Sequence, residues 1–432
     1  MLVVCKFGGS SVSSPERFHQ VKSIVESDDN RRVIVSSAIG KTTKDDNKIT
    51  DLLYLLSAHV KYNINFDSIL NKVKYRFNKI KEKLDLKIDL DKEFDEIVKH
   101  VDSEDYLVSR GEYLTSLMLS EYLGFRFIDA KDIIKFNYDG KINLEETYKL
   151  INEAYNSKDY IVVPGFYGSY PNGDIKLLSR GGSDITGAIL ARAINAERYE
   201  NFTDVDGFYV ASPKIVDSPK MIKEITYDEL RELSYMGASV IHEETIFPIQ
   251  DVNIPLYIKN TFNPDAKGTI INSSSADKSD IITGIAGKKD FISINVTKNK
   301  FSSKLEIIDY CLNVLKKYKV PVESIPTSID SFSVVVEEKL AKNYIYDILS
   351  DLKKNEDIID VKIDNNLALI AIVGRNMVYK PGISAKIFSI LGKNNINIKL
   401  ISQNTREISI IIGVQNEDFE NAINRVYDGL IR

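Results

Sequence analysis

Cysteine is scarce in this 432-residue chain, which contains only Cys5 and Cys311. The chain has no CxxC pair and no Cys/His spacing typical of a zinc site. The sequence therefore excludes a disulfide framework and a structural zinc site as the basis of the fold. Long apolar runs are also absent, because no stretch approaches the ~18 residues of a membrane span. We expect a protein that folds in water.

A strong excess of charge of one sign is missing as well. Lys and Arg number 57 against 62 Asp and Glu, which gives a net charge of −5. This balance excludes a nucleic-acid surface based on bulk basic charge, so a few local groups must hold any anionic ligand. The first residues, Met1–Lys6, lack the basic flank, apolar stretch and cleavage site of a signal peptide. We therefore expect a cytoplasmic protein with no nucleic-acid or membrane partner.

Residues 1 to about 270 alternate short β-rich runs with helical stretches, which is typical of an α/β domain with a mainly parallel sheet. A helix is predicted over Pro15–Glu26, with Ser14 as its N-cap. The segment Asn65–His100 has apolar residues at helical spacing and is predicted to form helices appended to the sheet. Strands are expected at Leu2–Phe7, Arg32–Ser36, Phe125–Asp129, Tyr160–Val163, Arg198–Thr203 and Ile254–Ile258.

An internal repeat begins near Ile281. Positions 322 and 333 correspond to positions 398 and 409, so the period is about 76 residues. The matching strands are Phe291–Val296 with Leu367–Ile372, Val322–Ile325 with Ile398–Ile401, and Ser333–Val336 with Ser409–Ile412. The helices expected between and after them are Ser303–Lys317 and Ala341–Lys354 in the first copy, and Ile383–Asn394 and Glu417–Leu430 in the second. The unit is βαββαβ, a ferredoxin-like sandwich present twice.

A strand followed by glycines opens the chain, in the run Lys6-Phe7-Gly8-Gly9-Ser10. Glycines just past a strand let backbone N–H groups approach an anion, a following helix adds the positive end of its dipole, and Lys6 adds a full charge. This run indicates phosphate binding, although a tight turn with a surface lysine also fits it. The chain has neither GxxxxGK[ST] nor GxGxxG, so P-loop and Rossmann dinucleotide sites are unsupported.

Two more turns suited to anions follow other predicted strands. The run Val33–Thr43 ends a buried strand in small hydroxyl residues, and Ser179–Asp184 leads into a helix of small residues. In the second run, Arg180 can bind a carboxylate through two hydrogen bonds, and Asp184 offers a fixed negative charge. Ligands of open α/β sheets bind outside the carboxyl ends of the strands, so we expect these turns to share one site.

Two other runs are compatible with a ligand or with ordinary structure. Ser109–Glu112 lies in a helical pattern, where Gly111 costs stability and permits close approach of a ligand. Phe202–Tyr209, followed by Ser212-Pro213-Lys214, is predicted to form a strand, an Asp-Gly turn and a second strand. A solvated glutamate and a plain hairpin explain these two runs equally well in isolation.

Taken in order, the motifs KFGGSS, VSSAIGKTT, SRGE, SRGGSD, TDVDGFY…SPK and MGASVIH resemble those of aspartate kinase (aspartokinase), within the amino acid kinase superfamily. The βαββαβ pair resembles its regulatory ACT domains. The resemblance covers essentially the whole chain and implies an amino acid kinase fold, an α/β fold with a mainly parallel sheet sandwiched by helices, plus two ferredoxin-like ACT modules. The implied domains are residues 1–275 for catalysis, 288–360 for the first ACT module, and 281–287 with 361–432 for the second. Because only Gly429–Arg432 follows the modules, the monofunctional form without homoserine dehydrogenase is expected.

The resemblance implies transfer of the γ-phosphoryl of ATP to the β-carboxylate of L-aspartate, giving 4-phospho-L-aspartate, the first step of lysine, threonine and methionine biosynthesis. Lys6 would stabilise the phosphoryl group during its transfer, and Asp184 would help to place the reacting groups. No general base is needed because the acceptor carboxylate is ionised at neutral pH. His242 is expected to be structural. Mg²⁺ would arrive with ATP, bridging phosphate oxygens and waters, without a dedicated metal site in the protein.

The resemblance also implies which residues bind the two substrates. Arg180 would pair with the α-carboxylate of aspartate and Glu112 with its ammonium, while Thr42 and Ser183 add hydrogen bonds. The nucleotide would be held by Lys6, Gly8, Gly9, Ser10, Thr203, Asp204, Tyr209 and Lys214.

Three positions depart from the family pattern. Ser10 keeps the hydroxyl of the usual Thr, so the interpretation is unchanged. Ser212 and Lys214 replace the usual Asp and Arg, so a bidentate phosphate contact is replaced by a point charge and nucleotide affinity is in question. His242 is followed by Glu243 instead of Pro, for which we have no physical account.

The ACT-like modules are expected to pair between subunits, giving a homodimer or homotetramer with an effector pocket at the interface. Lysine is the first expected effector and threonine the second, and a buried ligand ammonium would need a carboxylate nearby. Candidate effector contacts are Val322, Glu323, Thr327, Ser328 and Asp330, with Ser402-Gln403-Asn404 as the equivalent run of the second module. These residues could also form a strand and a turn with no effector.

Two other functions remain open. One is an amino acid kinase that acts on another acidic amino acid, such as glutamate. The other is a non-catalytic amino-acid sensor built on the ACT modules. The presence of Lys6, Glu112, Arg180 and Asp184 argues against the sensor.

Overall fold

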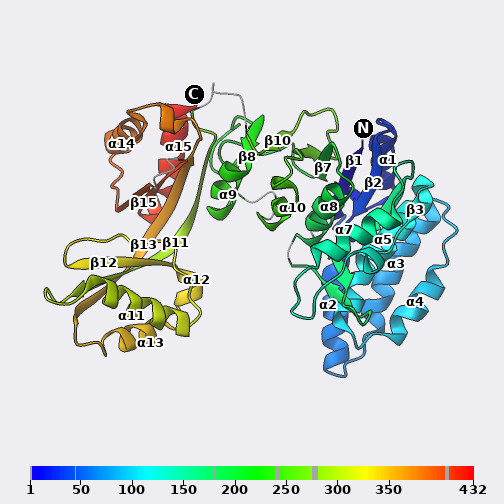
Figure 1. Ribbon diagram of the computed structural model, residues 1–432, viewed down its shortest axis with the longest axis horizontal. Helices are drawn as coiled ribbons and strands as arrows, with labels where there is room; N and C mark the ends of the chain where they lie inside the picture. Colours follow the sequence, from blue (N-terminus) through cyan, green and yellow to red (C-terminus); the bar gives the residue numbers. More distant parts are fainter. Residues whose placement is uncertain are drawn as a thin grey trace. The chain divides into compact units, whose positions relative to one another are not determined.

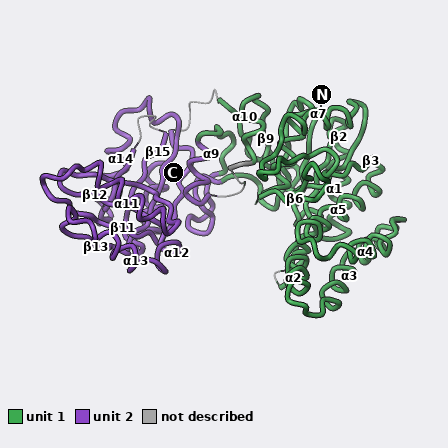
Figure 2. Tube along the Cα trace, turned by 60° about the horizontal axis from the view of Figure 1, so that its bottom comes forward, with its two compact units in different colours: residues 1–208, 221–228, 240–275 green, residues 209–220, 229–239, 276–432 purple. Residues whose placement is uncertain are grey.

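The computed structural model describes residues 2–43, 45–179, 181–238, 241, 243–274, 281–403 and 408–432. The chain forms two compact units, residues 1–208, 221–228 and 240–275 in the first and residues 209–220, 229–239 and 276–432 in the second (Figure 2). The units divide the chain differently from the predicted limits at 1–275, 288–360 and 281–287 with 361–432, which stay a prediction about domains.

The first unit contains an eight-stranded sheet in the order β3-β4-β2-β1-β7-β9-β10-β8. Neighbouring strands are parallel except β9 and β10, which are antiparallel. The strands are β1 (Val3–Phe7), β2 (Arg31–Ser36), β3 (Arg126–Phe127), β4 (Ile161–Pro164), β7 (Arg198–Thr203), β8 (Glu224–Thr226), β9 (Leu256–Asn260) and β10 (Thr269–Asn272). All six predicted strands of this region are present, although the run at 125–129 forms only two strand residues.

Helices surround this sheet, and the two that carry predicted site residues pack directly on it. Helix α8 contacts β1, β2 and β7, and α5 contacts β2 and β4. The helices of this unit are α1 (Pro15–Glu26), α2 (Ile49–Lys61), α3 (Asp67–Lys83), α4 (Leu90–Lys99), α5 (Glu104–Leu123), α6 (Ala130–Ile133), α7 (Leu144–Ala154), α8 (Gly182–Ala193) and α10 (Phe247–Gln250). Short 3-10 turns η1 (Gly9–Val12) and η2 (Glu243–Ile246) and the hairpin β5 (Tyr167–Ser169) and β6 (Ile175–Leu177) complete it.

The helical segment at 65–100 forms α3 and α4, as predicted, and both belong to the first unit (Figure 1). Their buried side chains lie at helical spacing, and Phe77 and Phe94 stack edge to face at 6.1 Å. The same hydrophobic cluster includes Val3 of β1 and Met118 of α5. The segment is therefore an extension of the main core and not a separate domain.

The second unit contains a five-stranded antiparallel sheet in the order β12-β11-β13-β15-β14. The strands are β11 (Gly284–Lys298), β12 (Ser331–Glu337), β13 (Ile358–Val373), β14 (Leu400–Gln403) and β15 (Ser409–Val414). The helices are α11 (Lys304–Lys317), α12 (Glu338–Ala341), α13 (Ile345–Leu352), α14 (Ile383–Lys393) and α15 (Phe419–Leu430), with the turns η3 (Met377–Tyr379) and η4 (Asn416–Asp418). Helix α9 (Tyr227–Tyr235) joins this unit from residue 229 onward.

The two repeats share one sheet because β11 and β13 run through both. The distal half of β11, from Phe291, pairs with β12 and with the first half of β13. Its proximal residues Gly284–Gly287 pair with Ile370–Val373, on the half of β13 that also pairs with β15. Residues Gly284–Gly287 therefore lie beside the strand of the second repeat, and the assignment of 281–287 to that module stays a prediction.

Two local predictions were wrong. The run Val322–Ile325 forms no strand and makes a single bridge, between Ser324 and Val335, because Pro326 has no N–H and interrupts the hydrogen-bond ladder with β12. No hairpin strand follows β7 either. The N–H of Phe208 instead donates to the Thr269 hydroxyl, which ties the turn to β10 and replaces a ladder with β7.

No helix in the described part of the chain is long and apolar enough to cross a membrane.

Candidate active site

Lys6 and Asp184 form an ion pair at the carboxyl end of the main sheet. Lys6 lies in the fully buried strand β1, opposite Asn201 of the parallel strand β7. Asp184 lies in the first turn of α8, and Lys6 Nζ is 2.5 Å from Asp184 Oδ1, with side chains only 10% and 15% exposed. The sheet and α8 thus hold a cation and an anion together in a poorly solvated place, where electrostatic interactions are strong.

Asn201 supports this pair and was missed by the sequence analysis. Its Nδ2 donates to the same Asp184 Oδ1 over 2.9 Å, and the Tyr199 hydroxyl donates to the main-chain oxygen of Asp184 over 3.1 Å. Asn201 is 3% exposed, and its Oδ1 has no hydrogen-bond partner among the described residues. A polar amide in an otherwise buried strand was the available signal, since buried polar groups usually have a specific partner.

Glu112 is a buried carboxyl group with an unused oxygen. It lies in α5, where Ser103 caps the first turn and Gly124 ends the helix at φ +72°. Glu112 is 4% exposed, and its Oε2 has no hydrogen-bond partner among the residues described. Burial raises the pKa of Glu112 to about 8, opposed in part by backbone N–H groups of Ala38 and Glu112 and by the charge of Arg110. Such a group is costly unless a cationic ligand pairs with it.

One cavity of about 840 Å³ brings these groups together. Four of the predicted residues line it, namely Lys6, Glu112, Ser183 and Asp184. Gly181, at φ +78°, turns the chain into α8 and lets the start of the helix reach the same cavity. Lys48 and Tyr54 also line it and were not predicted, because nothing in their spacing links the start of α2 to this edge of the sheet. Arg180 lies outside the described residues.

The turns that follow β1 and β2 touch each other. The Gly40 N–H donates to the Gly9 carbonyl oxygen over 2.9 Å, and a Cβ at Gly40 would lie 2.5 Å from the Gly9 carbonyl carbon. Only glycine fits that approach. Gly9 and Ser10 belong to the 3-10 turn η1, and α1 begins only at Pro15, so the glycines do not lead directly into the predicted helix.

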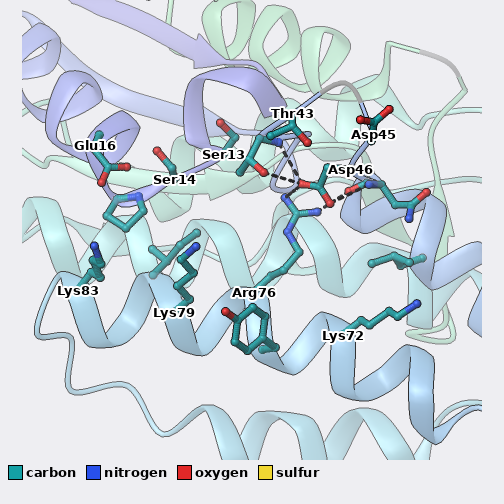
Figure 3. Close-up of a pocket in the computed structure, with 16 residues that line it drawn as sticks. Ser13, Ser14, Glu16, Thr43, Asp45, Asp46, Lys72, Arg76, Lys79 and Lys83 are labelled. Atoms are coloured by element: carbon teal, nitrogen blue, oxygen red, sulfur yellow. Dashed lines mark hydrogen bonds and ion pairs between the residues drawn. The ribbon is translucent and has the colours of Figure 1, made fainter.

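Thr42 lies beside this site but not in the same cavity. It lines a neighbouring cavity of about 530 Å³ (Figure 3), where its hydroxyl donates to Asp46 Oδ2 over 2.9 Å. The predicted contact of Thr42 with aspartate stays a prediction.

The predicted nucleotide residues fall in both units. Thr203 ends β7 and Asp204 follows it in the first unit, where the Thr203 hydroxyl donates to Asp204 Oδ1 over 3.2 Å. Tyr209 and Lys214 belong to the second unit, as does Ser212, whose hydroxyl oxygen accepts from the Lys214 N–H over 3.3 Å. Their role in ATP binding stays a prediction.

The candidate effector residues lie in the turn before β12 in the second unit. The Tyr235 hydroxyl of α9 donates to Glu323 Oε2 over 3.0 Å, and burial raises the pKa of Glu323. The Ser328 N–H donates to the Ser331 oxygen, and the Lys298 N–H to the Asp330 oxygen. Val322 and Thr327 flank these positions, and Thr327 bridges to Phe332. His242 and Asn404 lie outside the described residues.

Comparison with known proteins gives a family for both parts of the chain. The amino acid kinase family matches residues 1–260, and an ACT domain matches residues 370–430. Aspartokinase 3 of Bacillus subtilis is 32% identical over 446 residues, covering 98% of this chain and 97% of that protein. The chain belongs to the aspartokinase family. Its enzymatic activity is that of an aspartate kinase.

Solved structures agree with this family. The crystal structure of Clostridium acetobutylicum aspartate kinase is 44% identical, with a TM-score of 0.94 over 99% of this chain and 100% of that one. Aspartokinase III of E. coli is 24% identical with a TM-score of 0.78 and shares the fold over the full length of both chains. The ion pair Lys6–Asp184 and the buried Glu112 lie within residues 1–260, the part of the chain that matches the amino acid kinase family.

Proposed function

We propose that the 840 Å³ cavity is where the γ-phosphoryl of ATP passes to the β-carboxylate of L-aspartate. The products are 4-phospho-L-aspartate and ADP, and the reaction begins the route to lysine, threonine and methionine. One carboxylate oxygen of aspartate attacks the γ-phosphorus, and the bond from that phosphorus to the β,γ-bridging oxygen breaks. The acceptor is already ionised at neutral pH, so no residue has to remove a proton.

The single observation that carries this proposal is Glu112. A 96%-buried carboxyl group whose Oε2 has no hydrogen-bond donor among the described residues, in the same cavity as Lys6, matches the ammonium of an amino acid substrate. In the free enzyme, burial favours the protonated form of Glu112 at neutral pH. Entry of an ammonium favours the charged form, which makes a strong ion pair in a poorly solvated place. Glu112 therefore selects the α-amino group of the acceptor.

Lys6 supplies the positive charge for the transferred phosphoryl group. Its ammonium has three N–H donors, and one is directed to Asp184 Oδ1 at 2.5 Å. The other donors can face the phosphoryl oxygens, whose charge spreads in the transition state. Asp184 keeps Lys6 in place and is not consumed in the reaction. Gly9 and Ser10 add backbone N–H groups from the turn after β1, whereas the Gly8 N–H already donates to the Phe202 oxygen over 3.1 Å.

The remaining contacts follow the family motifs. Arg180 takes the α-carboxylate of aspartate, with hydrogen bonds from Ser183 and Thr42. Adenosine and the phosphates are assigned to Thr203, Asp204, Tyr209 and Lys214.

Mg²⁺ enters with the nucleotide. No group of three or more His, Cys, Asp or Glu side chains suited to a metal ion occurs among the residues that the structure describes. Asp184 Oδ1 already accepts from Lys6 and Asn201. These residues fit a metal held by phosphate oxygens and water better than a dedicated protein site. Bound in this way, Mg²⁺ neutralises phosphate charge.

The second unit binds an amino acid end product as its effector. Lysine is the first candidate for this effector and threonine is the second. Its pocket would include Val322, Glu323, Thr327, Ser328 and Asp330, with Glu323 facing the effector ammonium. The edge strand β14 pairs only with β15 among the described strands and offers backbone groups for pairing with a second copy, whereas residues 323–328 already bond to the outer edge of β12. Homodimers or homotetramers assembled through this unit are proposed. Sedimentation with and without lysine or threonine tests assembly, and an unchanged rate and oligomer with both would contradict this sensing role.

Initial rates with ATP, measured by coupled ADP production, test the catalytic proposal. We expect turnover with L-aspartate and little with L-glutamate. Lys6→Met should lower kcat by about a thousandfold. Lys22→Met, a lysine of α1 that lies 35% exposed near Glu26, is the matched control and should leave kcat unchanged. Turnover of glutamate without aspartate would contradict the proposed substrate.

A further inference from the structure

The segment between β2 and α2 is held from outside by one arginine of α3. Arg76 reaches from the middle of α3 to residues 40–43 and 45–47, here called the Thr42 segment (Figure 3). Its Nη2 donates to the Gly40 oxygen and its Nη1 to the Asn47 oxygen, at the two ends of the segment. The Arg76 side chain is only 13% exposed, so water competes little for these bonds.

Asp46 completes this connection. Arg76 Nη2 lies 3.3 Å from Asp46 Oδ2, and that same oxygen accepts from the Thr42 N–H over 3.1 Å and from the Thr42 hydroxyl over 2.9 Å. Asp46 Oδ1 accepts from the Asn47 N–H over 2.8 Å. Burial opposes ionisation of Asp46, but the bonds from Thr42 and the charge of Arg76 hold its pKa below the ordinary value. One planar guanidinium thus fixes two carbonyls and the carboxylate that orients Thr42.

The Thr42 segment is directly connected to the proposed active site. Its first residue, Gly40, bonds to Gly9 of the phosphate-binding turn. Ala38, two residues earlier, faces α5 so closely that a Cβ at Gly111 would lie 2.9 Å from its Cβ. The backbone N–H of Ala38 also lowers the pKa of Glu112. A shift of the Thr42 segment would therefore move groups that border both substrates.

Other cations on α3 do not share this role. Lys72, Lys79 and Lys83 line the same cavity and lie along the same helix (Figure 3). All three are exposed, and none forms an ion pair within the described parts of the chain. A lysine ammonium also lacks the flat fork that lets arginine bond several oxygens at once. Lys79, three residues from Arg76, is therefore a matched control for charge.

We propose that Arg76 is a positioning residue for the kinase reaction, which it serves by holding the Thr42 segment against the glycine turn after β1. The inference rests on the proposed function, because the site that Arg76 of α3 supports is the one proposed there. It also gives the helices at 65–100 a function in catalysis in addition to their place in the core.

Steady-state kinetics of Arg76→Met, Arg76→Lys and Lys79→Met tests this role. For Arg76→Met, we expect KM for aspartate to rise about tenfold while the melting temperature stays within a few degrees of wild type. Arg76→Lys should recover only part of the loss, since it restores the charge but not the three-way hydrogen bonding. Lys79→Met should behave as wild type.

A second variant keeps the test decisive if Arg76→Met does not fold. Asp46→Ala removes the acceptor for both Thr42 bonds but leaves the two Arg76 bonds to carbonyls, and it should also raise KM for aspartate. In the double variant Asp46→Ala with Arg76→Lys, the increases in KM for aspartate should be less than additive in free energy, because the two residues act together. A normal KM for aspartate in folded Arg76→Met, or in Asp46→Ala if only that variant folds, would overturn the inference. Absence of aspartate turnover in wild type would instead overturn the proposed function.

Discussion

Lys6 Nζ and Asp184 Oδ1 are 2.5 Å apart, and Asn201 donates to the same oxygen from the strand beside Lys6. Two residues, one from β1 and one from β7, therefore converge on one oxygen of a third residue, in α8. The parallel register of β1 and β7 places Lys6 and Asn201 opposite each other. This arrangement limits the directions in which the Lys6 ammonium can point and leaves its other donors for a phosphoryl group.

Removal of the Asn201 amide should slow catalysis without unfolding the enzyme. Asn201→Leu keeps the number and branching of the side-chain heavy atoms and eliminates a buried Oδ1 that has no described partner, so we expect little loss of stability. Asp184 loses one donor, and kcat should fall about tenfold. Steady-state rates and a thermal melt check this. Asn152→Leu, at an exposed position of α7, is the control, and a wild-type kcat in Asn201→Leu would show that the amide has no positioning role.

The raised pKa of Glu112 predicts a pH dependence for aspartate binding. Burial raises this pKa to about 8, so the carboxyl group of the free enzyme is mostly neutral at pH 7 and gains charge as pH rises. Because the charged form pairs with the substrate ammonium, KM for aspartate should fall between about pH 6.5 and 8. Glu112→Gln should have a higher KM with no such fall. Glu153→Gln on the surface of α7 should keep the wild-type profile, whereas a flat profile in wild type would contradict the assignment.

Helix α3 should contribute strongly to the stability of the first unit. Phe77 is fully buried against Phe94 in the main core cluster, so Phe77→Ala should lower the free energy of unfolding by about 3–5 kcal/mol. Tyr75 on the same helix is 67% exposed, and Tyr75→Ala should change it by about 0.5 kcal/mol or less. Denaturant unfolding of both variants measures the difference. Equal effects would mean that α3 is not part of the core.

Loss of the Tyr235 hydroxyl should make the enzyme more sensitive to an amino-acid effector. Tyr235 donates to Glu323 over 3.0 Å, and an effector ammonium would compete for the same carboxylate. In Tyr235→Phe the competing donor is gone. The effector concentration that gives half-maximal inhibition should therefore fall, by a factor of up to about three. Inhibition curves with lysine and threonine measure this shift. An unchanged curve would separate Tyr235 from effector binding.

Much of the fold could be predicted from the sequence, because buried strands and amphipathic helices repeat with clear periods. The helix at Pro15–Glu26 and the strands around Lys6 follow from such local patterns. The continuation of β11 and β13 through both repeats could not be predicted from spacing, which does not report that one strand crosses two modules; only the resemblance placed residues 281–287 with the second module. Whether residues 322–325 form a strand or only a single bridge depends in the same way on long-range pairing.

The candidate site was predictable where a motif combined glycine with charge. Lys6, Glu112, Ser183 and Asp184 meet in one cavity, as the motifs indicated. Asn201 and Arg76 were missed because their roles depend on contacts with residues 17 and about 30 positions away. Arg76 does not stand out in the local pattern of α3, and Asn201 gave only the signal of a polar amide in a buried strand.

The most direct test of the central claim compares L-aspartate with succinate, which lacks only the amino group. If Glu112 binds the substrate ammonium, wild-type kcat/KM for aspartate should exceed that for succinate by about 100-fold or more. Glu112→Gln should reduce this ratio to near one, mainly by losing activity on aspartate. A variant that keeps the wild-type preference for aspartate would contradict the account, because the ammonium would then be recognised elsewhere.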